Sequence, residues 1–120
     1  MGFSVIGGTQ LAVLAVYELS NMQGTPYDTS ALQVDNTSPT PGAGPITTTA
    51  PRDILFASLS ISGPVSTIAF ACGTIDVSTV SGYAIAHFTE TATGSYSDCW
   101  VLTGIGSTHQ QTFLSAYKGN

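Results

Sequence analysis

The feature that most constrains this chain is the shortness of its apolar runs. Residues that favour turns, chiefly Gly, Pro, Ser, Thr and Asn, interrupt the sequence about every ten residues. The runs between them are rich in Val, Ile, Thr, Tyr and Phe, and most are too short for a stable helix. The pattern therefore predicts an all-β protein, arranged as a sandwich or a barrel.

Individual strands are predicted from alternation and length. Apolar and polar residues alternate most clearly at residues 83–88 and 113–117, as in antiparallel strands with one buried face. The run at residues 10–19 does not alternate, and we interpret it as a buried strand because it is short and turn residues flank it. Residues 20–45 are mostly turn residues, and we expect a long loop there that packs on itself or has a function. Further strands are predicted at residues 46–49, 53–60, 66–71, 82–89, 96–102 and 111–117.

Length and charge limit the classes of protein to consider. A chain of 120 residues suits a single sandwich domain spanning residues 1–120. Only 8% of the residues are charged, against about 25% in ordinary soluble domains, so hydroxyl and amide side chains must carry the polar surface. Two basic residues, Arg52 and Lys118, oppose seven acidic ones. We therefore expect no binding to nucleic acid or to anionic membranes, whose phosphates are bound chiefly by Lys and Arg.

The chain contains no pattern for spanning a membrane. Its longest apolar run, residues 11–19, already contains Glu18, whereas a spanning helix needs about 20 apolar residues. The basic start of a secretory signal is lacking, because the first basic residue is Arg52. We expect that a signal was removed or that the protein leaves its cell by another route, and we place it in a virion or outside the cell.

The two cysteines, Cys72 and Cys99, leave two interpretations open. They form one disulfide in an oxidising compartment, or they are two buried free thiols that behave as small hydrophobic residues. Their distance in space decides between these, and the sequence does not give it.

Residues that could carry chemistry do not form a recognisable pattern. Neither His87 nor His109 has Cys, Asp or Glu at a spacing typical of zinc sites. A nucleophile elbow, a phosphate loop and a dinucleotide fingerprint are all lacking. Five carboxylates are candidates for acid and base work, and we interpret them mainly as structural: Glu18, Asp28, Asp53, Glu90 and Asp98. We predict no enzyme, no catalytic residue, no cofactor and no metal.

A ligand or partner surface is the remaining kind of site. Asp28 follows Pro26 and Tyr27, and we interpret it as a turn residue that caps nearby backbone amides. Trp100 shares strand parity with Leu102, which predicts burial in the core and not a role in binding. Four residues are assigned to a candidate surface for a ligand or partner: Tyr27, Asp28, Asn36 and Tyr83.

Several segments, taken in order, resemble a β-sandwich module of bacterial secreted proteins and phage structural proteins. They are LAVLAVYELS at residues 11–20, TPYD at 25–28, ITTTAPRDILFA at 46–57, GSYS at 94–97 with Trp100, and FLSAYK at 113–118. The resemblance implies a jelly-roll-like or lectin-like antiparallel sandwich, here of about seven to eight short strands, with no catalytic residues. The module usually has strands ahead of the first segment, so this chain resembles a shortened form. We expect another copy or another chain to cover the edges that missing strands would leave.

Two functions follow from these expectations. The first is a non-catalytic structural protein of a phage virion, a head-decoration or tail-associated protein that acts as a homo-oligomer or binds a capsid lattice. The alternative is a carbohydrate-binding or adhesive module of a bacterial secreted protein, in which exposed tyrosines stack on glycans.

Overall fold

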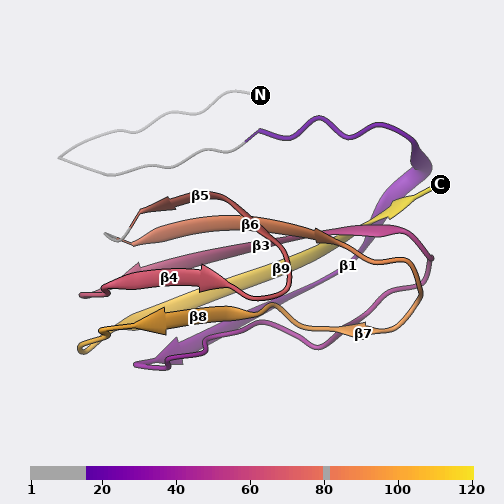
Figure 1. Cartoon of the computed structure of the whole chain (residues 1–120). Helices are drawn as coiled ribbons and strands as arrows, with labels where there is room; N and C mark the ends of the chain where they lie inside the picture. The colour runs from indigo at the N-terminus through magenta and orange to yellow at the C-terminus, as the bar shows by residue number, and fades with distance from the viewer. Residues whose placement is uncertain (1–15, 80–81) are drawn as a thin grey trace, which may run out of the picture.

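The chain folds into two layers of antiparallel strands, which confirms the prediction of an all-β sandwich (Figure 1). The computed structural model describes residues 16–79 and 82–120. The larger layer is a five-stranded sheet in the order β1-β9-β3-β6-β5. Its strands are β1 (Met22–Asn36), β3 (Asp53–Ser62), β5 (Thr74–Thr79), β6 (Tyr83–Thr89) and β9 (His109–Gly119). The described residues contain no helix long and apolar enough to cross a membrane.

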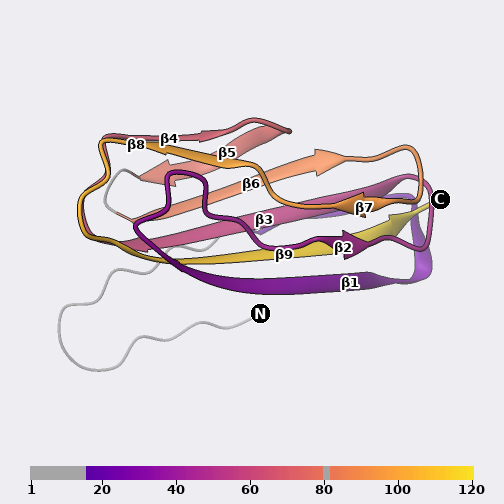
Figure 2. The same ribbon diagram turned by 90° about the horizontal axis from the view of Figure 1, so that it is seen from below.

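The second layer consists of two short strand pairs laid against one face of the large sheet (Figure 2). One pair joins β2 (Ile46–Thr47) to β7 (Ser95–Tyr96), and the other joins β4 (Thr67–Phe70) to β8 (Trp100–Thr103). We call the face of the large sheet that meets these pairs the inner face, and the opposite one the outer face.

The core lies between the layers because strand residues of one parity are apolar. In β3, buried residues alternate with half-buried ones, so Leu55, Ala57 and Leu59 all point inward. Trp100 of β8 is 1% exposed, as predicted, and its ring centroid lies 4.6 Å from that of Phe70 in β4. Burial of these large side chains against the sheet holds the two layers together.

The predicted strands at residues 46–49, 53–60, 66–71, 82–89 and 111–117 correspond to β2, β3, β4, β6 and β9. The predicted strand at 96–102 is divided into β7 and β8, because buried Asp98 interrupts the ladder and accepts a backbone hydrogen bond from Ala43. In the predicted strand at 10–19, residues 10–15 lie outside the described residues. The part from Val16 to Leu19 is not a strand, and Val16 is exposed.

The prediction of a loop over residues 20–45 is wrong for its first half. Residues from Met22 to Asn36 form β1, which pairs along its length with β9. The turn-forming side chains of this segment are overridden by backbone hydrogen bonds to a neighbour more than 70 residues away. The second half is a loop that packs on the inner face, where buried Gln110 accepts a hydrogen bond from Ser38 N and donates one to Ser38 O.

Candidate functional site

The four residues predicted as a ligand surface do not lie together. Tyr27 sits beside Tyr117, which pairs with Ile54 in β3, whereas Tyr83 pairs with Ser60 at the other end of the same strand. These two rows are six positions apart along β3, or roughly 20 Å. Asn36 lies at the far end of β1, where its Oδ1 is 2.7 Å from Nδ1 of His109. Asp28 belongs to a different cluster, described below, so the structure does not bring these four residues onto one surface.

The cysteines are joined, which resolves the alternative that the sequence left open. Cys72 and Cys99 form a disulfide with Cα atoms 5.8 Å apart, 27 residues apart in sequence. The bond continues the β4-β8 pair, since Ala71 N donates to Cys99 O at 3.0 Å just beyond the ladder. It therefore fixes the smaller layer next to the aromatic core.

A buried cluster of charged residues lies at the end of the large sheet where β1 begins, β3 begins and β9 ends. Asp53 and Lys118 are direct partners in the β3-β9 ladder, and both follow the inward parity of their strands. A bulge in β1 between Tyr27 and Thr29 contributes Asp28 to the same place. Lys118 Nζ lies 3.5 Å from Asp28 Oδ1, so three neighbouring strands bring one amine and two carboxyl groups together.

Hydrogen bonds in this cluster distinguish the two acids. Thr49 donates to both oxygens of Asp28, from its backbone N–H and from its hydroxyl, each at 2.6 Å. Burial raises the pKa of Asp28, but the Thr49 hydrogen bonds, together with Asp53 and the charge of Lys118, outweigh it and leave that pKa below its ordinary value. Asp53 is 1% exposed, and burial together with the neighbouring Asp28 carboxyl raises its pKa to about 6. Asp28 is thus the carboxylate of the pair and Asp53 the better proton donor.

Asp98 is a second buried acid and lies in the smaller layer. Its Oδ1 accepts a hydrogen bond from Ala43 N at 2.8 Å, and its Oδ2 has no partner among the described residues. Burial raises its pKa to about 7, against the lowering effect of the Ala43 bond. Its role is to hold the loop before β2 against the sandwich.

We expect Asp98→Asn to increase stability at pH 8 by about 1 to 2 kcal/mol, because a neutral amide replaces a carboxylate whose charge is disfavoured by burial. Between about pH 4 and pH 7 the native state binds more protons at Asp98 than the unfolded chain does, so stability falls as pH rises through this window. Urea unfolding at pH 4 and pH 8 measures the effect. An equal gain at both values would contradict this assignment.

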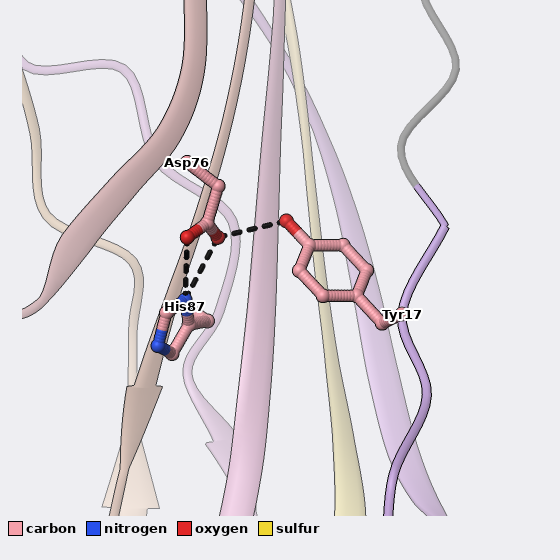
Figure 3. A network of polar contacts seen from close by, with 3 residues as sticks. All are labelled: Tyr17, Asp76 and His87. Atoms are coloured by element: carbon pink, nitrogen blue, oxygen red, sulfur yellow. Dashed lines mark hydrogen bonds and ion pairs between the residues drawn. The ribbon is translucent and has the colours of Figure 1, made fainter.

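A third polar cluster lies on the outer face and joins Tyr17, Asp76 and His87 (Figure 3). A bulge between Ile75 and Val77 places Asp76 beside His87 of β6, with Nδ1 of His87 2.7 Å from Asp76 Oδ2. Tyr17 donates to the same oxygen at 2.7 Å. Burial, followed by the contact with Asp76, raises the pKa of Tyr17 to about 12. This cluster fixes the segment before β1 against the sheet.

Aromatic residues continue from this cluster across the outer face. The Tyr17 ring centroid lies 4.4 Å from that of Phe56, which is 5.9 Å from Tyr117, and Tyr117 is 6.1 Å from Tyr27. A shallow hollow of about 360 Å³ lies between Tyr17, Phe56 and Tyr117. The row therefore offers flat apolar rings beside hydroxyl groups.

Apolar side chains are also exposed toward the other end of the outer face. Leu32 and Val34 of β1 are 59% and 62% exposed, and Phe113 of β9, the ladder partner of Leu32, is 41% exposed. We call these three residues the β1 stripe. It borders a hollow of about 240 Å³ that extends to Ile85 and Tyr83.

Among residues 16–79 and 82–120, no group of three or more His, Cys, Asp or Glu side chains is placed to hold a metal ion. No protein-family model, curated protein or solved structure matches this chain. The resemblance to the bacterial and phage module accordingly stays a prediction.

Sequence reasoning missed the role of Lys118 and Thr49, and it described Asp28 as a local turn residue. The alternation of β9 held a usable signal, since Lys118 has the parity of Leu114 and Ala116, which are fully buried. Asp53 likewise has the parity of Leu55. No signal in the sequence places Thr49 against Asp28, because 21 residues separate them.

Proposed function

We propose that this protein is a non-catalytic structural component of a phage virion, a head-decoration or tail-associated protein, and that it works through contacts between copies. The observation that carries the proposal is the edge of the large sheet at β1, which combines an unpaired backbone with the β1 stripe. A surface of hydroxyl and amide groups with few charges and an internal disulfide both suit a protein that works outside the cell.

The second half of the β1 edge, residues 29–36, lacks the proline and the bulge that protect its first half from strand pairing. Within the described residues, the segment from Thr29 to Asn36 has β9 on one side and no strand on the other. It contains neither Lys nor Pro, and Asp35 is its one charged residue. Exposed apolar edge strands of this kind tend to pair with another chain.

The backbone N–H and C=O groups of β1 that point away from β9 permit pairing with a second copy. Just beyond the ladder, Thr37 N donates to the carbonyl oxygen of Thr108, the residue before β9. By alternation, the odd-numbered residues of β1 direct their backbone groups to β9 and the even-numbered ones direct theirs outward. An antiparallel pair about a two-fold axis at Gln33 then aligns the outward groups of Leu32 with those of Val34 in the other copy. Asp35 lies opposite Ala31 in this register, so no like charges meet.

Size-exclusion chromatography with light scattering tests the assembly. We expect a dimer or larger symmetric oligomer, and we expect the double variant Leu32→Asn, Val34→Asn to weaken self-association by about tenfold or more per side chain, since each loses about 1.5 kcal/mol of apolar burial. Val101→Asn, at an exposed apolar residue of β8, is the matched control and keeps the wild-type mass. A wild-type monomer at millimolar concentration would contradict the proposal.

Mass spectrometry of purified particles tests the virion assignment, which fails if the protein is absent from them.

The aromatic row favours a second candidate, a carbohydrate-binding module. Tyr27 is exposed and packs edge-on against Tyr117, and the hollow of about 360 Å³ beside Phe56 presents aromatic rings on which a sugar ring could stack. In a glycan array, this function predicts reproducible binding that Tyr27→Ala reduces at least tenfold. Tyr83→Ala, at the other end of the sheet, should leave binding unchanged. An array without any binding glycan would argue for the structural role alone.

A further inference from the structure

The buried cluster of Lys118, Asp28 and Asp53 has the parts of an amide-forming centre. An amine nucleophile, a carboxyl electrophile and a second carboxyl group meet on three neighbouring strands; both carboxyl groups are buried and the lysine is partly exposed. We propose that Lys118 Nζ and the Asp28 side chain condense into an intramolecular amide, with Asp53 carrying the protons. The inference is independent of the proposed virion role.

The geometry places the reacting groups in contact. Lys118 Nζ is 3.5 Å from Asp28 Oδ1, and their side chains are 24% and 2% exposed. The β9 ladder fixes the backbone of Lys118, and the β1 bulge fixes that of Asp28. The two side chains are therefore held near each other by the fold. Holding two reactants at such a distance replaces an improbable encounter with an intramolecular step.

Asp53 is placed to move protons. Neither of its oxygens accepts a hydrogen bond from an N–H or O–H group of the described residues, and its polar neighbour is the Asp28 carboxyl. A buried carboxyl group in this position is stabilised as the neutral acid, which can donate to the Asp28 oxygen. The raised pKa described above agrees with this arrangement.

Thr49 supplies the hydrogen-bond donors that amide formation at Asp28 requires. When an amine adds to a carboxyl carbon, negative charge develops on the oxygens. Both oxygens of Asp28 already accept hydrogen bonds from Thr49, one from the backbone and one from the hydroxyl. Two fixed donors of this kind stabilise the tetrahedral intermediate before water has to reorganise.

The step balances without any external reagent. The Lys118 ammonium group passes one proton to the Asp28 carboxylate, whose Oδ1 lies 3.5 Å away, and the neutral amine attacks Cγ to form the C–N bond. Asp53 then protonates the departing hydroxyl, the C–O bond breaks, and one water leaves. The new amide nitrogen returns a proton to Asp53, which ends as the acid it was at the start. One ammonium and one carboxylate become one amide and one water.

The product would join β1 covalently to β9, its neighbour in the large sheet. β1 is an edge strand, and Lys118 lies at the end of β9, two residues before the last residue of the chain. Together with the disulfide of the smaller layer, this bond would give each layer its own cross-link.

Intact-mass spectrometry of the folded, purified protein, with the disulfide kept in one oxidation state, tests the proposal. We expect a mass lower than that of the sequence by one water, and tandem spectra that show a residue-28 peptide joined to a residue-118 peptide. Lys118→Arg keeps the positive charge but removes the amine, and it should have the full mass. Asp53→Ala should also have the full mass, or lose water far more slowly. Asp98→Asn, a change at a buried acid elsewhere, should retain the loss.

Asp28→Asn provides an independent check. Its side chain can condense with Lys118 by release of ammonia, and the resulting amide is chemically identical to the wild-type product, so the two final masses should agree. A folded wild-type protein with the full sequence mass would overturn the proposal. So would a loss of water that persists in Lys118→Arg, since this would indicate cyclisation within the Asp28 backbone. Circular dichroism of each variant establishes that it is folded before its mass is interpreted.

Discussion

Replacing Trp100 with alanine should lower the free energy of unfolding by about 3 to 5 kcal/mol. The side chain is 1% exposed and packs against Phe70, whose ring in turn lies 5.8 Å from that of Phe88 in the large sheet. Removal of the indole leaves a cavity between the layers. The rings of Phe70 and Phe88 cannot fill it unless the backbone of their strands moves. The expected effect is a large fraction of the total stability of a domain of this size.

Urea unfolding followed by far-ultraviolet circular dichroism measures the change, because Trp100 is the one tryptophan of the chain and its fluorescence is lost in the variant. Trp100→Phe should cost less than Trp100→Ala, since a ring still fills part of the space. The neighbouring exposed residue provides a matched control, and Val101→Ala should change stability by no more than about 0.5 kcal/mol. A cost below about 1 kcal/mol for Trp100→Ala would mean that the second layer does not pack as described.

Removal of the disulfide should cost about 3 to 4 kcal/mol, as expected for a cross-link that closes a loop of this length. The bond joins residues 27 apart and lies beside Trp100, so the unfolded chain gains freedom and the β4-β8 pair loses its covalent end. The double variant Cys72→Ala, Cys99→Ala should therefore unfold at lower urea concentration. The slope of the transition should rise slightly, because an unfolded chain without the cross-link exposes more surface.

Reduction of the wild-type protein provides the matched comparison. Dithiothreitol should lower its stability to about that of the double variant and should have no effect on the variant itself. If reduction leaves the wild-type transition unchanged, the two cysteines are not joined in solution, and the alternative of two free thiols applies.

Strands with a clear pattern could be predicted from sequence, and those without one could not. β3 and β6 have apolar residues at every second position, and the middle of β9 has them at Leu114 and Ala116, so burial of one face follows directly from that spacing. β5 also alternates, at Ile75 and Val77, a signal that the prediction missed, whereas β1 has no such pattern. β1 exposes Leu32 and Val34 and turns smaller side chains inward, so its hydrophobic residues do not indicate its buried face. β1 is an edge strand among the described residues, and pairing with β9 determined its structure more than its own composition did.

The candidate sites also divide into features that a local sequence pattern predicts and features that depend on strand pairing. The predicted burial of Trp100 needed only strand parity and is confirmed. The cluster of Asp28, Asp53 and Lys118 needed the β1-β9 and β3-β9 registers, which bring residues from both ends of the chain to one place. A bulge in β1 and another in β5 aim Asp28 and Asp76 at their partners, and local sequence does not specify a bulge without its opposite strand.

The sequence by itself determined that this protein is built from antiparallel strands with a shared apolar core, because the spacing of hydrophobic residues along a strand is a local property. Only the tertiary structure decided that the cysteines are joined, that the side chains of two aspartates and a lysine meet, and that the described part of the large sheet ends in an apolar edge at β1. Each of these depends on which strands lie side by side. Strand order and register come from the summed packing of the whole sandwich, and residues distant in the chain contribute to that sum without leaving a pattern near one another.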